Sequence, residues 1–583
     1  MGRVRLLEEA NPSVEERTLA AGAVGAEVRR FRAALDRAHR EIEDLRRSTA
    51  RDVGEDEAGI FDVQLMILED PLIVDRTLEA IRAEHKNAEF LFFRHVGEVA
   101  AKIEKLPDNY FSERATDLHD VKRRILRHLT GAGEVGSLPS GILFGRELTP
   151  SEAVQLDPER VHAFATELGG LTSHASIMAR ARGIPAVVGA KHLIESVRPG
   201  DLVVVDGISG HVVVHPTEKM VTRFRMRRRA FLRLQKRREK LVTEPAQTRD
   251  GHRIALSANM ELPEERDFVL DRGADGVGLF RTEFFFMVKR RAPTEEEQLS
   301  VYRRIMDGFG DLPVIIRVLD VGGDKVASYL GLPRERNPYL GMRGIRYLLA
   351  HPDVLTTQLR ALLRAAAGRR ARILFPMVSS VDEFVEAKRH TRGVIDSLKR
   401  RRIPHDSEPE LGAMIEVPSA AIQADELARE ADFFSIGSND LIQYLLAIDR
   451  DHETLGYLYQ PLHPAVLRTV AGVIQAGHRH RREVGVCGEM AGQPMAVPIL
   501  LGLGVDRLSV SPYMLPEVKQ TIRVLRFADC RRVAEEALRC SSARAVADLI
   551  QGSLGSRYST MLKLSQDTGF NGTPRTGIRG RKP

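Results

Sequence analysis

The fold of the C-terminal half is decided by the stretch Phe434-Ser435-Ile436-Gly437-Ser438-Asn439-Asp440-Leu441. An apolar run with strand preference ends at a glycine, and a polar cluster follows before a helical segment. The same unit recurs along the chain from about residue 250. The predicted strands are 253–258, 275–279, 313–319, 372–376, 411–416, 433–437, 484–488 and 506–510. Eight alternating strands and helices predict a (β/α)8 barrel, whose active site lies at the C-terminal ends of its strands.

Polar side chains collect where these strands end. They are Arg281, Thr282, Glu283, Arg317, Asp320, Asn337, Arg343, Glu416, Asn439, Asp440, Gln443, Arg450, Cys487 and Glu489. Converging arginines hold phosphate or carboxylate groups. Glu416 and Asp440 offer two oxygen ligands of the kind that Mg²⁺ prefers, and Cys487 offers a proton donor or acceptor. Taken singly, each arginine is also explained as an ion-pair partner, the carboxylates as backbone acceptors and Cys487 as a small buried hydrophobe.

Upstream of the barrel, a histidine follows a glycine pair in the stretch Gly169-Gly170-Leu171-Thr172-Ser173-His174-Ala175-Ser176. Thr172 and Ser173 are good helix N-caps, so His174 is expected at a helix start, where anions bind favourably. A histidine there is able to carry a phosphoryl group, or it is a capping-region residue without chemistry. Short predicted strands at 142–145, 161–166, 186–189, 202–206 and 211–215 place this histidine in a small α/β domain.

Residues 14–49 and 56–130 have apolar residues at helical spacing and predict a helical subdomain, which buries its own core or also docks a partner. The segment 217–242 is rich in arginine and lysine. A basic stripe of this kind binds nucleic acid in some proteins, but a single short run is more typical of a solvated linker helix, the interpretation we favour.

Length and composition indicate a protein of several domains. A chain of 583 residues is too long for one core. It contains neither an apolar run of membrane-spanning length nor a signal peptide, and its three cysteines are too few for a disulfide framework. These features predict a cytoplasmic location without membrane insertion. The net charge of +7 is compatible with an anionic small substrate or an acidic partner.

Several longer motifs resemble enzyme I of the bacterial phosphotransferase system, a family of phosphoenolpyruvate-utilising enzymes. They are residues 280–287 (Phe-Arg-Thr-Glu-Phe-Phe-Phe-Met), 293–298, 434–441 and 486–492 (Val-Cys-Gly-Glu-Met-Ala-Gly). The motifs occur in the order found in the family, and the resemblance extends from about residue 20 to about residue 530. Pyruvate phosphate dikinase and phosphoenolpyruvate synthase are less similar, because the chain has neither a glycine-rich nucleotide loop nor the length for a nucleotide-binding domain. A regulatory scaffold without catalysis is disfavoured by the complete set of site residues.

The resemblance implies a phosphorelay. His174 would take the phosphoryl group of phosphoenolpyruvate, releasing pyruvate, and would pass it to a histidine of the small phosphocarrier protein HPr as the first step of sugar uptake. Cys487 would protonate the methylene carbon of the enolate. The implied substrate-binding residues are Thr172, Arg281, Arg317, Arg343, Asn439, Asp440 and Arg450, and the implied Mg²⁺ ligands are Glu416 and Asp440.

The resemblance also implies an α/β multidomain fold and a homodimer formed through the barrel. The expected parts are a phosphohistidine α/β domain (1–22 and 131–216), a helical HPr-binding subdomain (23–130), a linker helix (217–242), a phosphoenolpyruvate-binding (β/α)8 barrel (243–555) and a disordered basic tail (556–583).

The sequence departs from the family pattern at a few places. The family has an opening Ser-Pro-Gly strand before the position of Met1, so a first strand of the histidine domain is expected to be missing. Leu171 stands where arginine is common, and Ala175 where threonine is common. Further replacements are Val318, Met342 and Gln493. Ala175 removes a hydroxyl beside His174, which bears on the rate of phosphoryl transfer.

Overall fold

The computed structural model divides the chain into two compact units, Met1–Arg228 and a second that begins at Arg229. It describes residues 1–7, 14–52, 60–68, 70, 73–103, 109–131, 138–149, 152–153, 156–169, 176, 179, 183–287, 291–322, 328–332, 335–450, 452, 455–556, 558–559 and 562. Thr172, His174, Leu171 and Ala175 therefore lie outside the described residues. A search of the described helices finds no membrane-spanning segment.

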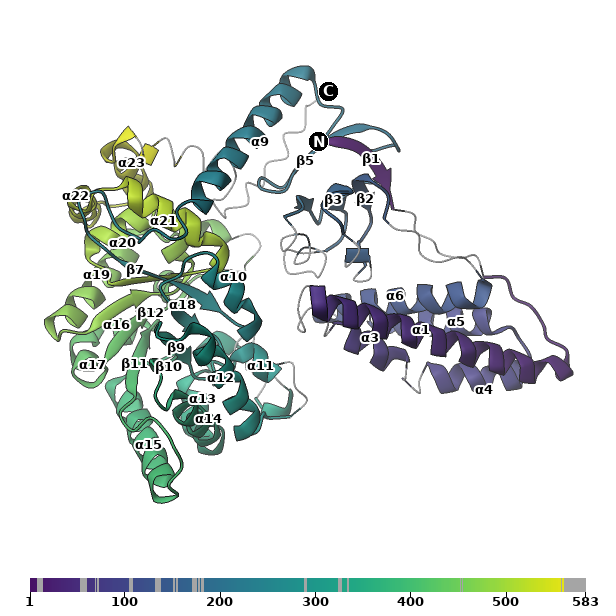
Figure 1. Cartoon of the computed structure of the whole chain (residues 1–583), viewed down its shortest axis with the longest axis horizontal. Helices are drawn as coiled ribbons and strands as arrows, with labels where there is room; N and C mark the ends of the chain where they lie inside the picture. The colour runs from purple at the N-terminus through teal and green to yellow at the C-terminus, as the bar shows by residue number, and fades with distance from the viewer. Residues whose placement is uncertain are drawn as a thin grey trace. The chain divides into compact units, whose positions relative to one another are not determined.

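The first unit contains a bundle of helices that run alongside one another (Figure 1). The helices are α1 (Val24–Asp52), α3 (Ile60–Leu68), α4 (Val74–Glu84), α5 (Ala88–Ile103) and α6 (Asn109–Thr130). Their apolar residues recur at helical spacing and meet in one core, which includes the fully buried Phe31, Phe61 and Phe92. The predicted helical subdomain is confirmed.

The same unit contains a six-stranded sheet in the order β4-β3-β2-β1-β5-β6. Its strands are β1 (Gly2–Leu6), β2 (Gly141–Gly145), β3 (Val161–Thr166), β4 (Ala186–Val187), β5 (Leu202–Asp206) and β6 (His211–Val214). The expectation of a missing strand ahead of Met1 stays a prediction, and the first residues of the chain themselves form β1, an inner strand. It pairs in parallel with β2 and antiparallel with β5, and its Val4 side chain is fully buried.

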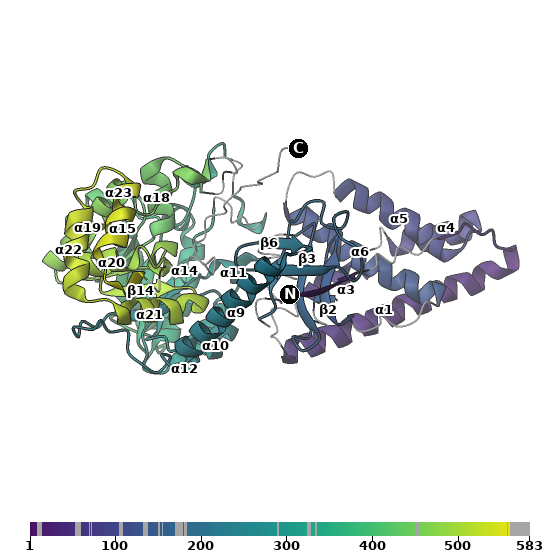
Figure 2. The same ribbon diagram turned by 90° about the horizontal axis from the view of Figure 1, so that it is seen from above.

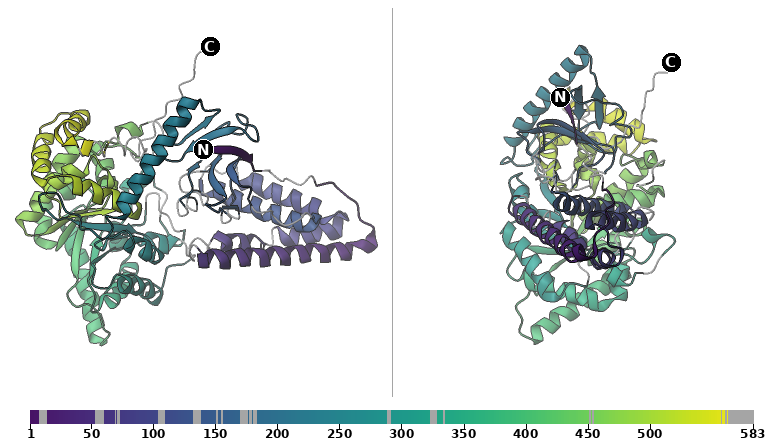
Figure 3. Two further views of the ribbon diagram at one scale, coloured as in Figure 1. Left: turned by 45° about the horizontal axis from the view of Figure 1, so that its top comes forward. Right: turned by 90° about the vertical axis from the view of Figure 1, so that its right-hand side faces the viewer.

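Helix α9 (Glu218–Glu239) occupies the predicted linker and appears as one continuous helix in Figure 3. Near its middle, Arg227 forms an ion pair with Asp206 of β5 at 3.0 Å. Near its end, Arg238 contacts Glu517 at 3.1 Å and also donates to Gln520. Part of the basic stripe is therefore used in folding contacts within each unit, as expected for a linker helix.

The second unit is a closed barrel of eight parallel strands in the order β10-β11-β12-β13-β14-β7-β8-β9. The strands are β7 (Ala255–Met260), β8 (Val277–Phe280), β9 (Val314–Arg317), β10 (Ala371–Phe375), β11 (Glu410–Ile415), β12 (Phe433–Ile436), β13 (Glu483–Val486) and β14 (Arg507–Val510). Each overlaps one of the eight predicted strands, so the barrel is confirmed. Strands of a closed parallel barrel are covered by helices outside and by side chains inside, which explains their nearly continuous apolar runs.

Helices cover the outside of this barrel, and Figure 2 shows α20, α22 and α23 among them. The helices are α10 (Arg266–Leu270), α11 (Glu283–Met287), α12 (Glu295–Phe309), α13 (Ile345–Ala350), α14 (Pro352–Ala366), α15 (Val381–Arg400), α16 (Pro418–Ile422), α17 (Ala424–Glu430), α18 (Ser438–Leu446), α19 (Pro464–Arg479), α20 (Val497–Leu503), α21 (Leu515–Val524), α22 (Phe527–Ala537) and α23 (Ala543–Ser553). Short 3₁₀ turns lie at Ala21–Ala23, Pro263–Glu265, Ser328–Leu330, Pro338–Leu340, Gly456–Leu458, Glu489–Gly492 and Pro512–Met514.

The chain remains packed on the barrel beyond the predicted domain end at residue 555. Tyr558 is buried, and its hydroxyl donates a hydrogen bond to the carbonyl oxygen of Pro494 at 2.9 Å. Leu562 also belongs to the barrel core. The predicted disorder of the basic tail from 563 to 583 falls outside the described residues.

Candidate active site at the C-terminal end of the barrel

Arg317 ends strand β9 and is buried between two carboxylates. Its Nη2 lies 2.9 Å from Glu283 Oε1, and its Nη1 lies 3.1 Å from Asp320 Oδ2. Burial alone would lower the pKa of this guanidinium, but the charges of Glu283, Asp320 and Glu416 outweigh it and raise the pKa above its usual value. The side chain is therefore a fixed cation at the end of the barrel.

Arg343 bridges two further carboxylates. Its Nε and Nη2 donate to the two oxygens of Asp320, each at 3.1 Å, and its Nη1 and Nη2 donate to the two oxygens of Asp440, each at 3.0 Å. Nη1 also donates to the hydroxyl of Tyr444 at 3.3 Å. All five N–H donors of the guanidinium thus have protein acceptors. Burial opposes the charge, but Asp320 and Asp440 raise the pKa of Arg343.

Glu416 directly follows β11 and is almost completely buried. Its Oε1 accepts a hydrogen bond from the backbone N–H of Met377 at 2.7 Å. A Cβ at Gly437 would lie 2.9 Å from the Glu416 Cβ, so this carboxylate depends on glycine as its neighbour. Burial, with the charges of Asp440 and Asp320, raises the pKa of Glu416 to about 8 despite the nearby arginines. The surroundings therefore destabilise the ionised form of Glu416, and a cation bound beside it would stabilise that form.

Arg281 and Asn439 are more accessible. Among the described residues, the Arg281 side chain, 34% exposed, forms one ion pair, with Glu261 Oε1 at 2.7 Å. Asn439 pairs twice with Glu489: its Nδ2 donates to Oε1 at 3.3 Å, and its Oδ1 accepts from the Glu489 backbone N–H at 2.8 Å. An anionic ligand can replace the single carboxylate partner of Arg281 without leaving a buried charge unpaired.

Arg450 follows α18, and its backbone N–H donates to Gln443 Oε1 at 3.3 Å. Arg281, Arg317, Glu416 and Cys487 lie at the ends of their strands, as a (β/α)8 barrel requires. Asn439 and Asp440 lie in the first turn of α18 after β12, and Arg343 lies just before α13. His174 and Thr172 lie outside the described residues, so their predicted roles stay predictions.

Cys487 follows β13 and points into the barrel, where it is 2% exposed. It packs in one interior layer with Leu279, Ile315, Leu374, Met414 and Phe433. Its Sγ donates to the Ile436 carbonyl oxygen at 3.7 Å. Burial raises the pKa of the thiol to about 11, although a hydrogen bond from Ser435 acts in the opposite direction. Cys487 therefore remains a protonated thiol at neutral pH.

The three cysteines differ in accessibility. Cys487 and Cys530 are buried, whereas Cys540 is half-buried, and none forms a disulfide. Burial also raises the pKa of Cys530 to about 12. Cys487 follows a barrel strand, whereas Cys530 lies in α22 and Cys540 follows that helix.

Sequence reasoning noted Asp320 and Glu283 at strand ends but gave them no role. In the structure they hold the arginines: Asp320 contacts both Arg317 and Arg343, and Glu283 Oε1 also accepts from the Asp320 backbone N–H at 3.1 Å. The three-residue spacing of Arg317 and Asp320 was the only local signal for this arrangement. The Arg317–Glu283 and Arg343–Asp440 pairs join parts of the chain that meet only when the barrel closes, and Arg343 is 23 residues from Asp320.

Comparison with known proteins agrees with this architecture. Three domain families match the chain: the PEP-utilising enzyme, PEP-binding domain over residues 235–527, the PEP-utilising enzyme, N-terminal over residues 1–114, and the PEP-utilising enzyme, mobile domain over residues 138–210. His174 falls within the mobile domain, and the barrel residues described above fall within the PEP-binding domain.

Curated relatives match along most of the chain. The phosphoenolpyruvate-protein phosphotransferase of Staphylococcus carnosus is 40% identical over 533 residues, which are 90% of this chain and 92% of the relative. That of Listeria innocua is 41% identical over 535 residues, 91% of this chain and 93% of the relative. An NMR solution structure of Enzyme I is 34% identical and covers 40% of this chain and 94% of its own, with a TM-score of 0.33. By its sequence relatives, the chain belongs to the phosphoenolpyruvate–protein phosphotransferases, the enzyme I family of the bacterial phosphotransferase system.

Proposed function

We propose that the protein transfers the phosphoryl group of phosphoenolpyruvate to its own His174 and then to a histidine of the phosphocarrier HPr, releasing pyruvate as the first step of a sugar-uptake phosphorelay. The observation that carries this proposal is the set of arginines, carboxylates and one thiol gathered at one end of the barrel. Phosphoryl transfer depends mainly on positioning and charge neutralisation, which such a set supplies.

The substrate anion would be bound by arginines and an amide. Arg281 and Arg317 would hold the phosphoryl group, with Arg343, Asn439, Asp440 and Arg450 completing the site and Thr172 holding the phosphohistidine. Arg281 has one exposed carboxylate partner and exchanges it readily. Arg317 keeps its pairs with Glu283 and Asp320 and contributes a fixed positive potential.

Glu416 and Asp440 would hold a divalent cation, which we assign as Mg²⁺. No cluster of three or more metal-binding side chains occurs in the part of the chain that the structure describes, so substrate oxygens would complete the coordination shell. The residues fit such an ion, because the buried Glu416 carboxylate lies among like charges that raise its pKa. When bound, Mg²⁺ neutralises charge on the phosphoryl and enolate oxygens.

The chain's own groups would then complete the reaction. A neutral ring nitrogen of His174 attacks phosphorus, the bond from phosphorus to the enol oxygen breaks, and the enolate of pyruvate remains in the barrel. Cys487 supplies its thiol proton to the methylene carbon of this enolate, which forms the methyl group of pyruvate and leaves a thiolate. The raised pKa of Cys487 keeps that proton in place until the enolate forms.

Partners and location follow from the same proposal. The helical subdomain would bind HPr, and the barrel would form a homodimer. The α/β domain of residues 1–22 and 131–216 would carry the phosphohistidine in the cytoplasm.

The direct test is labelling with phosphoenolpyruvate that carries a radioactive phosphoryl group. In the presence of Mg²⁺, the protein should give an acid-labile phosphoprotein without ATP, and addition of HPr should move the label to HPr. His174→Ala should take up no label, and labelling of that variant at the wild-type level would overturn the assignment.

A further inference from the structure

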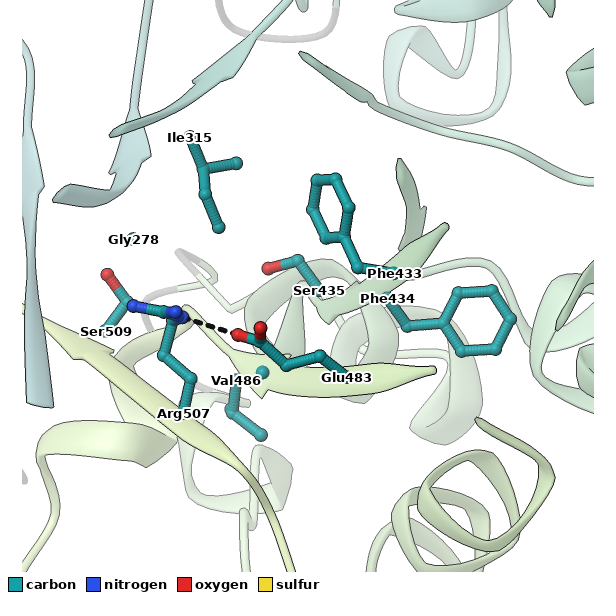
Figure 4. Close-up of a pocket in the computed structure, with 10 residues that line it drawn as sticks. Gly278, Ile315, Phe433, Phe434, Ser435, Glu483, Val486, Arg507 and Ser509 are labelled. Atoms are coloured by element: carbon teal, nitrogen blue, oxygen red, sulfur yellow. Dashed lines mark hydrogen bonds and ion pairs between the residues drawn. The ribbon is translucent and has the colours of Figure 1, made fainter. Parts of the chain in front are cut away.

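A small cavity lies inside the barrel on the N-terminal side of the Cys487 layer. Its lining includes Ser435, Ser509, Glu483, Arg507, Ile315 and Phe433 (Figure 4). Two of these side chains, Ile315 and Phe433, also pack in the interior layer that contains Cys487, so the cavity and the thiol share a wall. The cavity volume of about 10 Å³ is close to what one water molecule requires.

Two inward-facing glycines create this space. A Cβ at Gly278 would overlap the Ser509 hydroxyl, so that position is already filled by its neighbour. A Cβ at Gly485 would meet its nearest atoms, those of Arg507, at 3.5 to 3.8 Å, which is ordinary van der Waals contact. The space beside Gly485 therefore accepts a methyl group without displacing the barrel wall.

Polar groups line the cavity from its mouth to its inner end. At the mouth, Glu483 is paired with Arg507 at 2.8 Å and with Arg372 at 2.7 Å, and its side chain is 29% exposed to solvent. Ser509 donates to Asn259 Oδ1 at 2.7 Å and keeps lone pairs that can accept a further hydrogen bond. Figure 4 shows the Ser435 hydroxyl directed into the space in front of the Glu483–Arg507 pair.

Ser435 connects this cavity to the thiol. It is 3% exposed and lines the cavity, and it lies opposite Gly485 in the pairing of β12 with β13, two residues before Cys487 on the same inward face of β13. In this position its hydroxyl lowers the pKa of the Cys487 thiol and so opposes the effect of burial. The backbone of Cys487 is held from the same side, since Asn259 Nδ2 donates to its carbonyl oxygen at 2.9 Å. Cys487 thus lies directly beside the cavity, with Ser435 and the shared residues Ile315 and Phe433 between the thiol and the empty space.

The proposed function, on which this inference rests, leaves Cys487 as a buried thiolate after each turnover. Such a thiolate is costly in an apolar layer and must regain a proton before the next enolate forms. While product or new substrate occupies the C-terminal end of the barrel, the proton has to reach the buried thiol from another side.

We propose that Cys487 is reprotonated from the N-terminal end of the barrel, through Ser435 and one water molecule in the cavity beside Gly485. The Ser435 O–H bond breaks as the new S–H bond forms. The serine oxygen takes a proton from the water, and the water is replenished by a solvent acid at the mouth beside Glu483. The net change is one proton moved from a solvent acid to the thiolate.

Gly485→Ala tests this route because it fills the cavity and leaves Cys487 and Ser435 unchanged. The matched control is Gly472→Ala, on the exposed side of α19 where an added Cβ meets no atom within 4 Å. With excess phosphoenolpyruvate, Mg²⁺ and HPr, rapid-quench measurements on Gly485→Ala should show one pyruvate per chain formed at the wild-type rate. Later turnovers should be about tenfold slower, because the stored proton has been used. Later turnovers at the wild-type rate would overturn the proposal.

A second measurement follows the proton directly and does not depend on turnover. The Cys487 S–H stretch, assigned by its loss in Cys487→Ala, is observed by infrared spectroscopy after transfer of the protein into D₂O. Oxalate, a planar dianion resembling the enolate, blocks the C-terminal end. Wild type and Gly472→Ala should still exchange S–H for S–D, whereas Gly485→Ala and Ser435→Ala should exchange about tenfold more slowly.

The outcomes separate this inference from the proposed function. If oxalate stops exchange in the wild type, the proton enters from the catalytic end and the cavity route is wrong. If exchange follows the cavity but Cys487→Ala forms pyruvate at the wild-type rate, the route is correct and the assigned proton donor is wrong. If the circular dichroism spectrum of Gly485→Ala shows that this variant is misfolded, Ser435→Ala is used in its place. Slower S–H exchange in Ser435→Ala then supports the route, and exchange at the wild-type rate overturns it.

Discussion

Arginines at the catalytic end of the barrel differ in how firmly the protein already holds them. Arg281 has one exposed partner, Arg317 lies between two buried carboxylates, and Arg343 has an acceptor for each of its N–H groups. Removing one partner from a buried pair leaves an uncompensated charge and is costly. Substrate binding is therefore expected to rearrange partners most easily at Arg281 and least easily at Arg343.

Glu416→Gln is expected to separate stability from activity. Burial and neighbouring carboxylates raise the pKa of Glu416 to about 8, above the usual value of 4.5. Between these two pH values the unfolded chain binds fewer protons than the folded chain, so the free energy of unfolding falls as pH rises. Glutamine has no charge to lose or gain, so the variant is free of this pH-dependent destabilisation. Its amide oxygen still accepts the hydrogen bond from the Met377 N–H.

In EDTA, the variant should therefore melt a few degrees higher than wild type at pH 8, and the difference should shrink towards pH 5. Phosphorylation by phosphoenolpyruvate should fall about 100-fold or more, because a metal ligand is lost. Thermal unfolding by circular dichroism checks the first statement. Glu426→Gln, exposed on α17, is the control and should change neither quantity. If the difference in melting temperature between Glu416→Gln and wild type did not change with pH, the raised pKa of Glu416 would be wrong.

Cys487→Ala should lower kcat for pyruvate formation about 100-fold, since general acids contribute at least that much. KM for phosphoenolpyruvate should stay within about threefold, because the thiol acts on the enolate rather than on the bound substrate. Steady-state assays with HPr measure both constants. Cys540→Ala, at a half-buried position away from the site, serves as the control. A raised KM with unchanged kcat would assign Cys487 to binding instead.

Among the elements, the barrel strands were the most predictable and their pairing partners the least. Apolar runs bounded by glycine and proline identify the eight strands, and parallel pairing follows from the helices between them. Five residues at the N-terminus form β1, which lacked a strong local signal and gains its place from pairing with β2 and β5. Likewise, Arg343 lies 97 residues from Asp440, and no local pattern predicts that pair.

Two glycines of the barrel unit, one in a strand and one in a helix, are expected to affect the free energy of unfolding in opposite directions when each is replaced by alanine. A Cβ at Gly412 of β11 would overlap the ring of Phe433 on the neighbouring strand, so Gly412→Ala should lower the free energy of unfolding by about 1 to 3 kcal/mol. Gly393 is exposed in α15, and an added Cβ meets no atom within 4 Å. Gly393→Ala should therefore raise the free energy of unfolding by about 0.5 to 1 kcal/mol. Denaturant unfolding measures the change in each variant. A change in the same direction for both variants would contradict the packing described here.

At the scale of the whole molecule, the chemistry is divided between two units. The carboxylates and the thiol belong to the barrel, whereas the mobile-domain match places His174 in the first unit. The sequence predicted this division, because the basic segment 217–242 separates the short strands around His174 from the eight regularly alternating strands of the barrel. It did not predict the cavity behind Cys487, because Gly278 of β8 and Gly485 of β13 come to line one interior space only when the barrel closes.

This division predicts that chelation separates the two half-reactions. EDTA should abolish transfer from phosphoenolpyruvate to His174, since both proposed metal ligands lie in the barrel. Transfer from previously phosphorylated protein to HPr should proceed at an unchanged rate, because it needs only the first unit. Gel-based transfer of radioactive label measures each step. Loss of the second step in EDTA would show that the metal also acts outside the barrel.

The unequal burial of the cysteines makes the natural chain suitable for optical distance measurement. Thiol-reactive dyes will attach at Cys540 in the barrel unit and spare Cys487 and Cys530, which are buried and whose thiols have raised pKa values. A second cysteine at the exposed Lys191 of the first unit completes a donor–acceptor pair without removal of any native thiol. Single-molecule energy transfer between these dyes would then follow the distance between the two units while the protein carries out the proposed reaction with phosphoenolpyruvate and HPr.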